Sequence, residues 1–561
     1  MDASTIHNRR WGILGVLVIC LLVVILDNTI LNVALKTIQE DLNASQSQMQ
    51  WAVDSYVLVF AGLLITWGVL GDRLGRKKVL LFGMAAFGLT SALCSFAGSP
   101  TELILFRALM GIGAAAVQPQ TLSIITNVFE PHERAKAIGI WAGASGIAIA
   151  LGPITGGLLL QYFWWGSIFL VNVPIVIVGL VLIVWLVPDS KDPSPGRLDP
   201  TGVLVSMVAL VSLVYGVIEG GNRNDWLAWN TLGAIVFGVV LLAVFVVQQR
   251  RSTHPTIDMS LFANRSFSAG TVAIALTFFA LTGATFYLAY YLQAVRGYSA
   301  LSAGIALIAV AAAVMVAAPL SAPLARRFGV RVVVAAGMTI FGVNLCLYVF
   351  TTQSMPQWVV EVMMACMGIG MGLTMSPASN AIMGAVPRAK AGAGSAVNNT
   401  VRQVASALGV AILGSIVAVV FRDHLGAGTP ASVANRLDQP AAVVSHLPAH
   451  LQVNQLVTGD TSQSIGNALQ FVGQSGQVLQ QRAAATHASP QQVADARAAD
   501  TAVLGHFVAQ SKSAFMAAMH VASVVAGLIT LCGALIALLY LPGREREPEP
   551  KRTDAEVAVA A

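Results

Sequence analysis

Blocks of about 20 apolar residues follow one another along almost the whole of this 561-residue chain. Stretches such as Trp11–Ala34 and Val79–Gly98 contain almost no charged residue. A helix of about 20 apolar residues is long enough to cross roughly 30 Å of hydrocarbon. Only 10% of the residues are charged, whereas soluble domains carry about 25%. The sequence therefore predicts an all-α polytopic membrane protein.

Fourteen such blocks predict fourteen transmembrane helices. They are too long and too evenly apolar for the alternating strands of a membrane barrel. Their approximate limits are 11–34, 50–70, 79–98, 103–125, 137–160, 166–187, 201–218, 229–248, 268–292, 301–324, 332–350, 357–385, 396–421 and 515–541.

The distribution of lysine and arginine predicts the orientation of these helices. With the N-terminus in the cytoplasm, basic residues gather in the inner loops, whereas the short outer loops hold only Lys36, Arg223 and Arg296. Cytoplasmic loops of membrane proteins are enriched in basic residues. An even number of spans then places both termini in the cytoplasm of a multi-pass protein of the plasma (inner) membrane. The net charge of +6 is therefore explained by topology, and no nucleic-acid partner is expected.

A faint internal repeat predicts how the helices are grouped. The loops Gly71–Lys78 and Pro323–Arg331 are both short, basic and glycine-containing. The two loops occupy equivalent positions if residues 1–187 and 268–541 each form a six-helix bundle. Residues 188–267 then hold an inserted pair of helices, the seventh and eighth spans, and residues 542–561 form a cytoplasmic tail. The segment 422–513 is predicted to be a partly helical extracellular loop within the second bundle.

Three ionisable residues inside the predicted helices need an explanation, because a charge in the bilayer centre is costly. Asp27 lies in the outer half of the first span, and Asp54 and Arg107 lie near the outer ends of the second and fourth. Burial disfavours a charged carboxylate and a nearby arginine favours it, so such a group can bind and release a proton as its exposure changes. We expect these residues to couple transport to protons. A static ion pair that holds helices together is the alternative.

Three further clusters are candidate functional segments. The loop after the second span is expected to act as a gate through Gly71, Asp72, Arg73, Gly75 and Arg76. The fifth span, with its small residues and a proline, suits a tight helix interface or hinge; its key positions are Gly152, Pro153, Gly156 and Gly157. The start of the thirteenth span is a candidate substrate cavity, lined by Asn398, Asn399, Arg402 and Gln403, although Arg402 could instead extend to the inner surface.

No phosphate-binding loop of the GxxxxGK[ST] type, no GxSxG and no cluster with the spacing of a metal site occurs in the sequence. We therefore expect neither an enzyme nor an ATP-driven pump, and no cofactor or metal. The energy source is expected to be the proton gradient.

These segments resemble the major facilitator superfamily, specifically its fourteen-span drug:proton antiporter branch of the QacA/EmrB type. The run Gly68–Lys77 is similar to the motif A loop, Arg107 with Gly111 and Gly113 to motif B, and Gly152–Gly157 to the antiporter motif C. Leu26–Ile30 is similar to the first-span motif of this branch, and Asn172-Val173-Pro174 to the start of a sixth span. One departure is Ala148, where motif C usually has glycine.

The resemblance implies a major-facilitator fold and the export of amphipathic, often cationic, drugs in exchange for protons by a monomer. Some relatives carry a substrate-linked acid in the tenth span, which has none here. Two other functions stay open on the residues alone. One is a dedicated exporter of a single metabolite or antibiotic, or an uptake symporter. The other is a receptor or channel that does not transport against a gradient.

Overall fold

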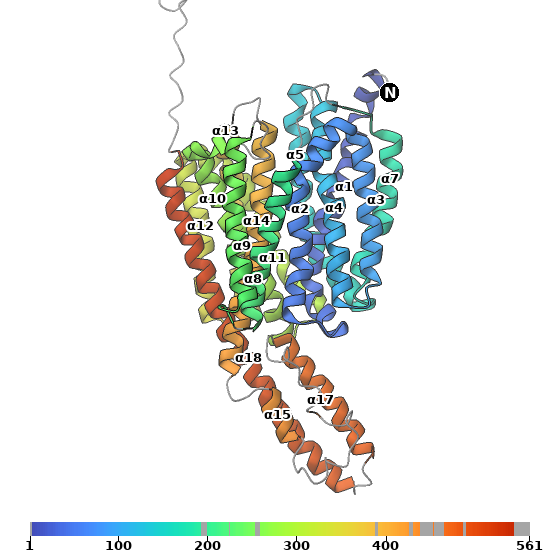
Figure 1. The fold of residues 1–561 in the computed structure, drawn as a ribbon, viewed down its shortest axis with the longest axis vertical. Helices are drawn as coiled ribbons and strands as arrows, with labels where there is room; N and C mark the ends of the chain where they lie inside the picture. The colour runs from blue at the N-terminus through green and yellow to red at the C-terminus, as the bar shows by residue number, and fades with distance from the viewer. Residues whose placement is uncertain are drawn as a thin grey trace, which may run out of the picture.

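The computed structural model describes residues 3–191, 199–223, 225–252, 259–386, 391–425, 430–437, 453, 465–485 and 490–542. The tail predicted at 542–561 therefore lies outside the described residues except for its first residue. The described chain is all-α, as predicted. Two bundles of long, roughly parallel helices stand side by side, and a helical hairpin projects from one end (Figure 1).

The N-terminal bundle is built from residues before the predicted boundary at 187. It consists of α1 (Ala3–Asp41), α2 (Gln46–Leu74), α3 (Arg76–Ser95), α4 (Pro100–Val128), α5 (Pro131–Tyr162), the short α6 (Ser167–Leu170) and α7 (Asn172–Leu186).

The inserted pair is α8 (Pro200–Arg223) and α9 (Trp229–Arg251). Helix α8 packs against both α2 and α14, so the pair lies beside the seam between the two bundles. Val239 and Val240 of α9 are exposed, as expected for a helix that faces hydrocarbon.

The C-terminal bundle begins with a 3-10 turn η1 (Met259–Ala263). It continues with α10 (Arg265–Tyr290), a π-helical turn η2 (Tyr291–Val295), α11 (Ala300–Phe328), α12 (Val330–Leu347), a 3-10 turn η3 (Tyr348–Phe350), α13 (Gln357–Gly384), α14 (Ala391–Leu425) and α18 (Pro490–Tyr540).

Twelve of the described helices are long and apolar enough to cross a membrane. The number is 13 if the two parts of α2, which meet at a 50° bend between Leu64 and Thr66, are one span. Helix α5 overlaps the predicted fifth span and is 32 residues long, but it is not among these 13. A multi-pass protein is thus confirmed, and the count of fourteen stays a prediction.

The long segment between α14 and α18 contains α15 (Pro430–Leu437) and α17 (Ile465–Ala485). Helix α18 begins at Pro490, well before the span predicted from 515, and α17 packs against it. Both project beyond the bundles (Figure 1). We call this end of the molecule the hairpin end, and the end that carries the N-terminus the opposite end.

The internal repeat is visible in the backbone at the opposite end. Gly75 separates α2 from α3 and Gly329 separates α11 from α12, with φ values of +113° and +88°. The backbone N–H of Arg76 then donates to Ser190, just after α7, and that of Arg331 donates to Pro542, just after α18. Each bundle therefore ties the start of its third long helix to the end of its last one.

Candidate functional site

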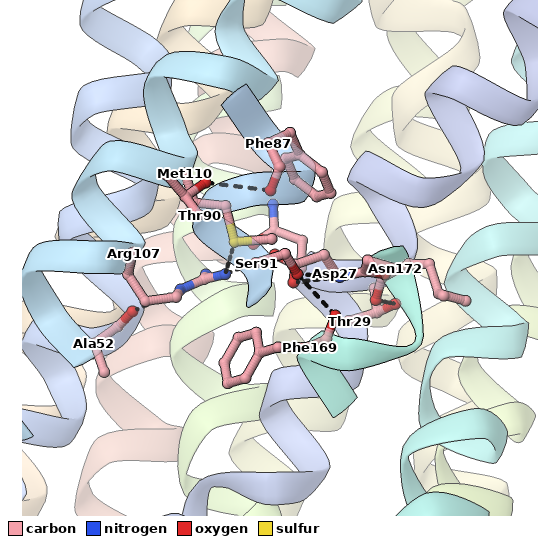
Figure 2. A network of polar contacts seen from close by, with 12 residues as sticks. Asp27, Thr29, Ala52, Phe87, Thr90, Ser91, Arg107, Met110, Phe169 and Asn172 are labelled. Atoms are coloured by element: carbon pink, nitrogen blue, oxygen red, sulfur yellow. Dashed lines mark hydrogen bonds and ion pairs between the residues drawn. The ribbon is translucent and has the colours of Figure 1, made fainter. Parts of the chain in front are cut away.

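The centre of the N-terminal bundle holds a fully buried ion pair. Arg107 of α4 and Asp27 of α1 lie side by side in the polar network of Figure 2. Arg107 Nη1 donates to Asp27 Oδ2 over 2.6 Å, and neither side chain is exposed. Two charges in a region of low dielectric attract strongly, but each loses its hydration. Asp27 and Arg107, which the sequence places in the first and fourth spans, are thus in direct contact.

Both partners are held by further polar groups. Asn172, the first residue of α7, donates from Nδ2 to Asp27 Oδ1 over 3.1 Å and also lies 3.1 Å from Ser91 Oγ of α3. Arg107 Nε donates to the carbonyl oxygen of Ala52 over 3.1 Å, and its guanidinium carbon lies 4.2 Å from the centre of the Tyr56 ring. The pair therefore joins α1, α2, α3, α4 and α7, all from one bundle.

Asp54 is buried in α2 but does not join this network. Neither of its carboxylate oxygens has a hydrogen-bond partner among the described residues. The backbone of its helix does reach the ion pair, through Ala52 two residues earlier. The structure thus brings together two of the three predicted coupling residues and leaves the third as a separate buried carboxylate.

Asn172, Ser91 and Tyr56 were missed as site residues by the sequence analysis. The available signal was weak: each is a polar side chain within or beside an apolar block. Whether such a side chain faces the acid of another helix depends on the rotation of both helices, which composition does not report.

The predicted gating loop forms its own ion pair. Asp72 Oδ1 accepts from Arg76 Nε over 2.9 Å and from Nη2 over 2.8 Å. Gly71 lies against the Gln120 side chain of α4, where an added methyl carbon would be only 1.9 Å from Oε1. Gly75 provides the turn at positive φ, and Arg73 is exposed.

The glycines of the predicted antiporter motif let α5 approach two helices closely. A methyl carbon at Gly152 would lie 1.9 Å from Thr29 Oγ1, and one at Gly156 would lie 2.8 Å from Ile30 Cγ1. Both contacts fall on α1 within one turn of Asp27. The buried Ala148 shows that the methyl group at the departure from the motif is accommodated.

The same motif also meets the other bundle. A methyl carbon at Gly157 would lie 2.5 Å from Leu301 Cα of α11, and one at Gly304 would lie 2.2 Å from the carbonyl oxygen of Pro153. Gln293 of η2 donates to the carbonyl oxygen of Val33 of α1 over 2.9 Å. The two bundles thus meet closely at the hairpin end.

The candidate cavity residues lie on α14. Asn398, Asn399, Arg402 and Gln403 are all half-buried. The guanidinium carbon of Arg402 lies 4.8 Å from the centre of the Phe278 ring of α10. Phe278 is in the middle of its 26-residue helix, so the Arg402 charge is placed at the level of the middle of α10.

The sequence profile of the Major Facilitator Superfamily matches residues 17–410. The multidrug efflux pump LfrA of Mycolicibacterium smegmatis is 37% identical over 449 residues, which cover 79% of this chain and 89% of the relative. The tetracenomycin C resistance and export protein of Streptomyces glaucescens is 32% identical over 417 residues, which cover 74% of this chain and 77% of the relative.

Solved structures show a similar fold at low sequence identity. A bacterial homologue of the human lysosomal transporter Spinster, in an inward-facing and unoccupied conformation, superimposes with a TM-score of 0.58 at 16% identity. The match covers 94% of this chain and 98% of that one.

Proposed function

Because this chain belongs to the Major Facilitator Superfamily, we propose that it exports amphipathic small molecules in exchange for protons. The observation that carries the proposal is the fully buried pair of Asp27 and Arg107. An ionisable pair at membrane depth is a typical element of a proton pathway. Relatives that are 37% and 32% identical are named for multidrug efflux and for resistance and export, which supports the direction of transport.

A proton on Asp27 would remove the negative charge that holds Arg107. Arg107 would keep its contacts with Ala52 and the Tyr56 ring, both on α2. Its attraction to α1 would fall to that of a hydrogen bond to a neutral group. Proton binding therefore loosens α1 from α4 while leaving α4 attached to α2.

The antiporter motif can pass this change on to the other bundle. Gly152 and Gly156 pack against Thr29 and Ile30, next to the carboxylate, while Pro153 and Gly157 pack against α11. A displacement of α1 would therefore shift α5, and a shift of α5 would change its contact with α11, which closes the seam at the hairpin end. Two bundles that rock about a central site are the usual basis of alternating access.

Asp54 is the second candidate proton carrier. Its carboxylate is buried without a partner among the described residues, and it lies on α2, which packs against α14 of the other bundle. We propose that Asp27 and Asp54 titrate at different stages of the cycle, since only one of them has an arginine counter-charge.

The orientation and assembly are part of the same proposal. The basic loops with Gly75 and Gly329 lie at the opposite end, which we assign to the cytoplasm with both termini, in a cell membrane. The hairpin end is then extracellular, and the structure corresponds to a state that is closed on the outside. One chain contains both bundles, so a monomer is sufficient for transport.

The test uses everted membrane vesicles with an acidic lumen and a fluorescent lipophilic compound that carries a carboxylate, such as rhodamine B. The unaltered protein should accumulate the compound and release protons from the lumen. Asp27→Asn keeps the size and the acceptor oxygen but cannot ionise, so both signals should be lost. Glu102→Gln, an exposed carboxylate on α4, should leave them unchanged. Proton-coupled accumulation that persists in Asp27→Asn would show that Asp27 is not the carrier.

A further inference from the structure

The Arg402 charge in α14 has no acidic partner in the described structure. Its guanidinium faces the Phe278 ring, which stabilises a cation but does not neutralise it. A cation at membrane depth usually pairs with an acid or faces a water-filled space. Helix α14 is surrounded by α2, α8, α10, α13 and α18, so hydration of Arg402 by bulk solvent is restricted.

The sequence of the C-terminal bundle offers almost no acid that could pair with Arg402. Between Asp258 and Asp423 the chain contains one acidic residue, Glu361. Glu361 lies in the second turn of α13 at the hairpin end, where its Oε1 accepts from Gln357 over 2.7 Å. Between Lys390 and Arg422, Arg402 is the only charged residue in the sequence.

The two acids that are buried in the described part of the N-terminal bundle, Asp27 and Asp54, are also unavailable. Asp27 is held by Arg107. Gly414 of α14 lies against the side chain of Gln50 of α2, and the two helices run in opposite directions (Figure 1). Asp54 is one turn from Gln50, which places it level with Val410. Arg402 is two further turns away, about 12 Å at 1.5 Å per residue.

Unused hydrogen-bonding capacity accompanies this charge. Asn398 lies one turn before Arg402 on the same face of α14, and its Oδ1 is buried without a hydrogen-bond partner among the described residues. A ligand that accepts from Arg402 and donates to Asn398 Oδ1 would satisfy this face of the helix.

We infer that Arg402 binds a carboxylate, or an anionic group of similar geometry, on the transported compound, and that Asn398 Oδ1 accepts from a neighbouring donor of the same compound. This inference rests on the proposed function and specifies its substrate class: amphipathic anions and zwitterions rather than simple cations. The planar guanidinium can hold both oxygens of a carboxylate at once. The Phe278 ring supports the other face of the guanidinium.

The experiment compares rhodamine B, which carries a free carboxylate, with its methyl ester, which does not. Uptake is measured in proteoliposomes with an acidic lumen, with the membrane potential set to zero by valinomycin and potassium. Arg402→Gln should lower the rate for rhodamine B at least about tenfold, because charge-assisted hydrogen bonds are lost, and should leave the ester within about twofold. Arg265→Gln, which removes an exposed positive charge from the end of α10, should change neither rate.

A binding measurement and a second variant make the outcome decisive. Binding of both dyes to purified protein, by fluorescence anisotropy, should show the same loss of carboxylate preference in Arg402→Gln, even if neither dye is transported. If Arg402→Gln does not purify as a single species, Arg402→Lys takes its place, because it keeps the charge but loses the planar fork. It should weaken rhodamine B binding more than ester binding.

The inference is overturned if the unaltered protein binds both dyes alike, or if Arg402→Gln weakens both equally. The proposed function fails separately, if the unaltered protein accumulates no compound under a proton gradient while the binding preference and its loss in Arg402→Gln are still observed.

Discussion

Asp27 and Arg107 form an ion pair of 2.6 Å with no exposed surface on either side chain. The two residues are 80 positions apart in the chain and lie on α1 and α4. Neither charge can be hydrated, so each depends on the other. Their mutual dependence makes the pair sensitive to a proton on the carboxylate and also makes it sensitive to mutation.

Arg107→Gln should destabilise the protein by about 3–5 kcal/mol, because it leaves the Asp27 carboxylate buried without its counter-charge. The double variant Asp27→Asn/Arg107→Gln should be more stable than Arg107→Gln alone, since no charge then remains at the site. Thermal unfolding in detergent measures both. Destabilisation of the double variant by the full sum of the two single effects would contradict this dependence.

Asn172→Leu should slow proton-driven export and lower the stability by about 1–3 kcal/mol, because Asp27 Oδ1 loses its amide donor in a buried site. Ser91→Ala is the milder comparison: it removes the hydroxyl that contacts Asn172 and donates to the Phe169 carbonyl oxygen, but leaves the Asn172–Asp27 hydrogen bond. Transport rates at a fixed pH gradient distinguish the two variants. If Asn172→Leu and Ser91→Ala slowed transport equally, the hydrogen bond from Asn172 to Asp27 would not be the contact that matters for transport.

Gly157→Ala should disfavour the state that is closed at the hairpin end, because its methyl carbon would lie 2.5 Å from Leu301 Cα, a backbone atom that cannot rotate away. The expected result is faster labelling, by a membrane-impermeant thiol reagent, of a cysteine introduced at the seam between α5 and α11. The comparison is made on a background without the five native cysteines.

Gly233→Ala is the matched control for this experiment. Nothing lies within 4 Å of the position that its methyl carbon would occupy in α9, so labelling should match that of the parent protein. Unchanged labelling in Gly157→Ala would show that this close contact does not hold the seam shut.

Gly75→Ala and Gly329→Ala should destabilise the two bundles by similar amounts, about 1–2 kcal/mol each, because both positions have φ values that are strained for alanine. Thermal unfolding is again the measurement. Gly12→Ala, at a helical position with nothing within 4 Å, should not destabilise. A large effect at only one of the two turns would argue against their structural equivalence.

The sequence by itself determined the class of the protein and the approximate positions of many of its helices. The length and apolarity of a block are local properties, so they place helices such as α3 and α12 close to the predicted 79–98 and 332–350. The glycine-containing basic loops also revealed the repeat, because a one-residue turn at positive φ requires glycine at Gly75 and Gly329.

Tertiary structure alone decided which side chains meet. Asp27, Asp54 and Arg107 were predicted at similar depth, yet only Asp27 and Arg107 pair, whereas Asn172 completes the site. Depth along a helix follows from residue number, but the direction of a side chain depends on how each helix is rotated against its neighbours. That rotation is set by close contacts such as Gly152 on Thr29, which form only when distant segments have packed together.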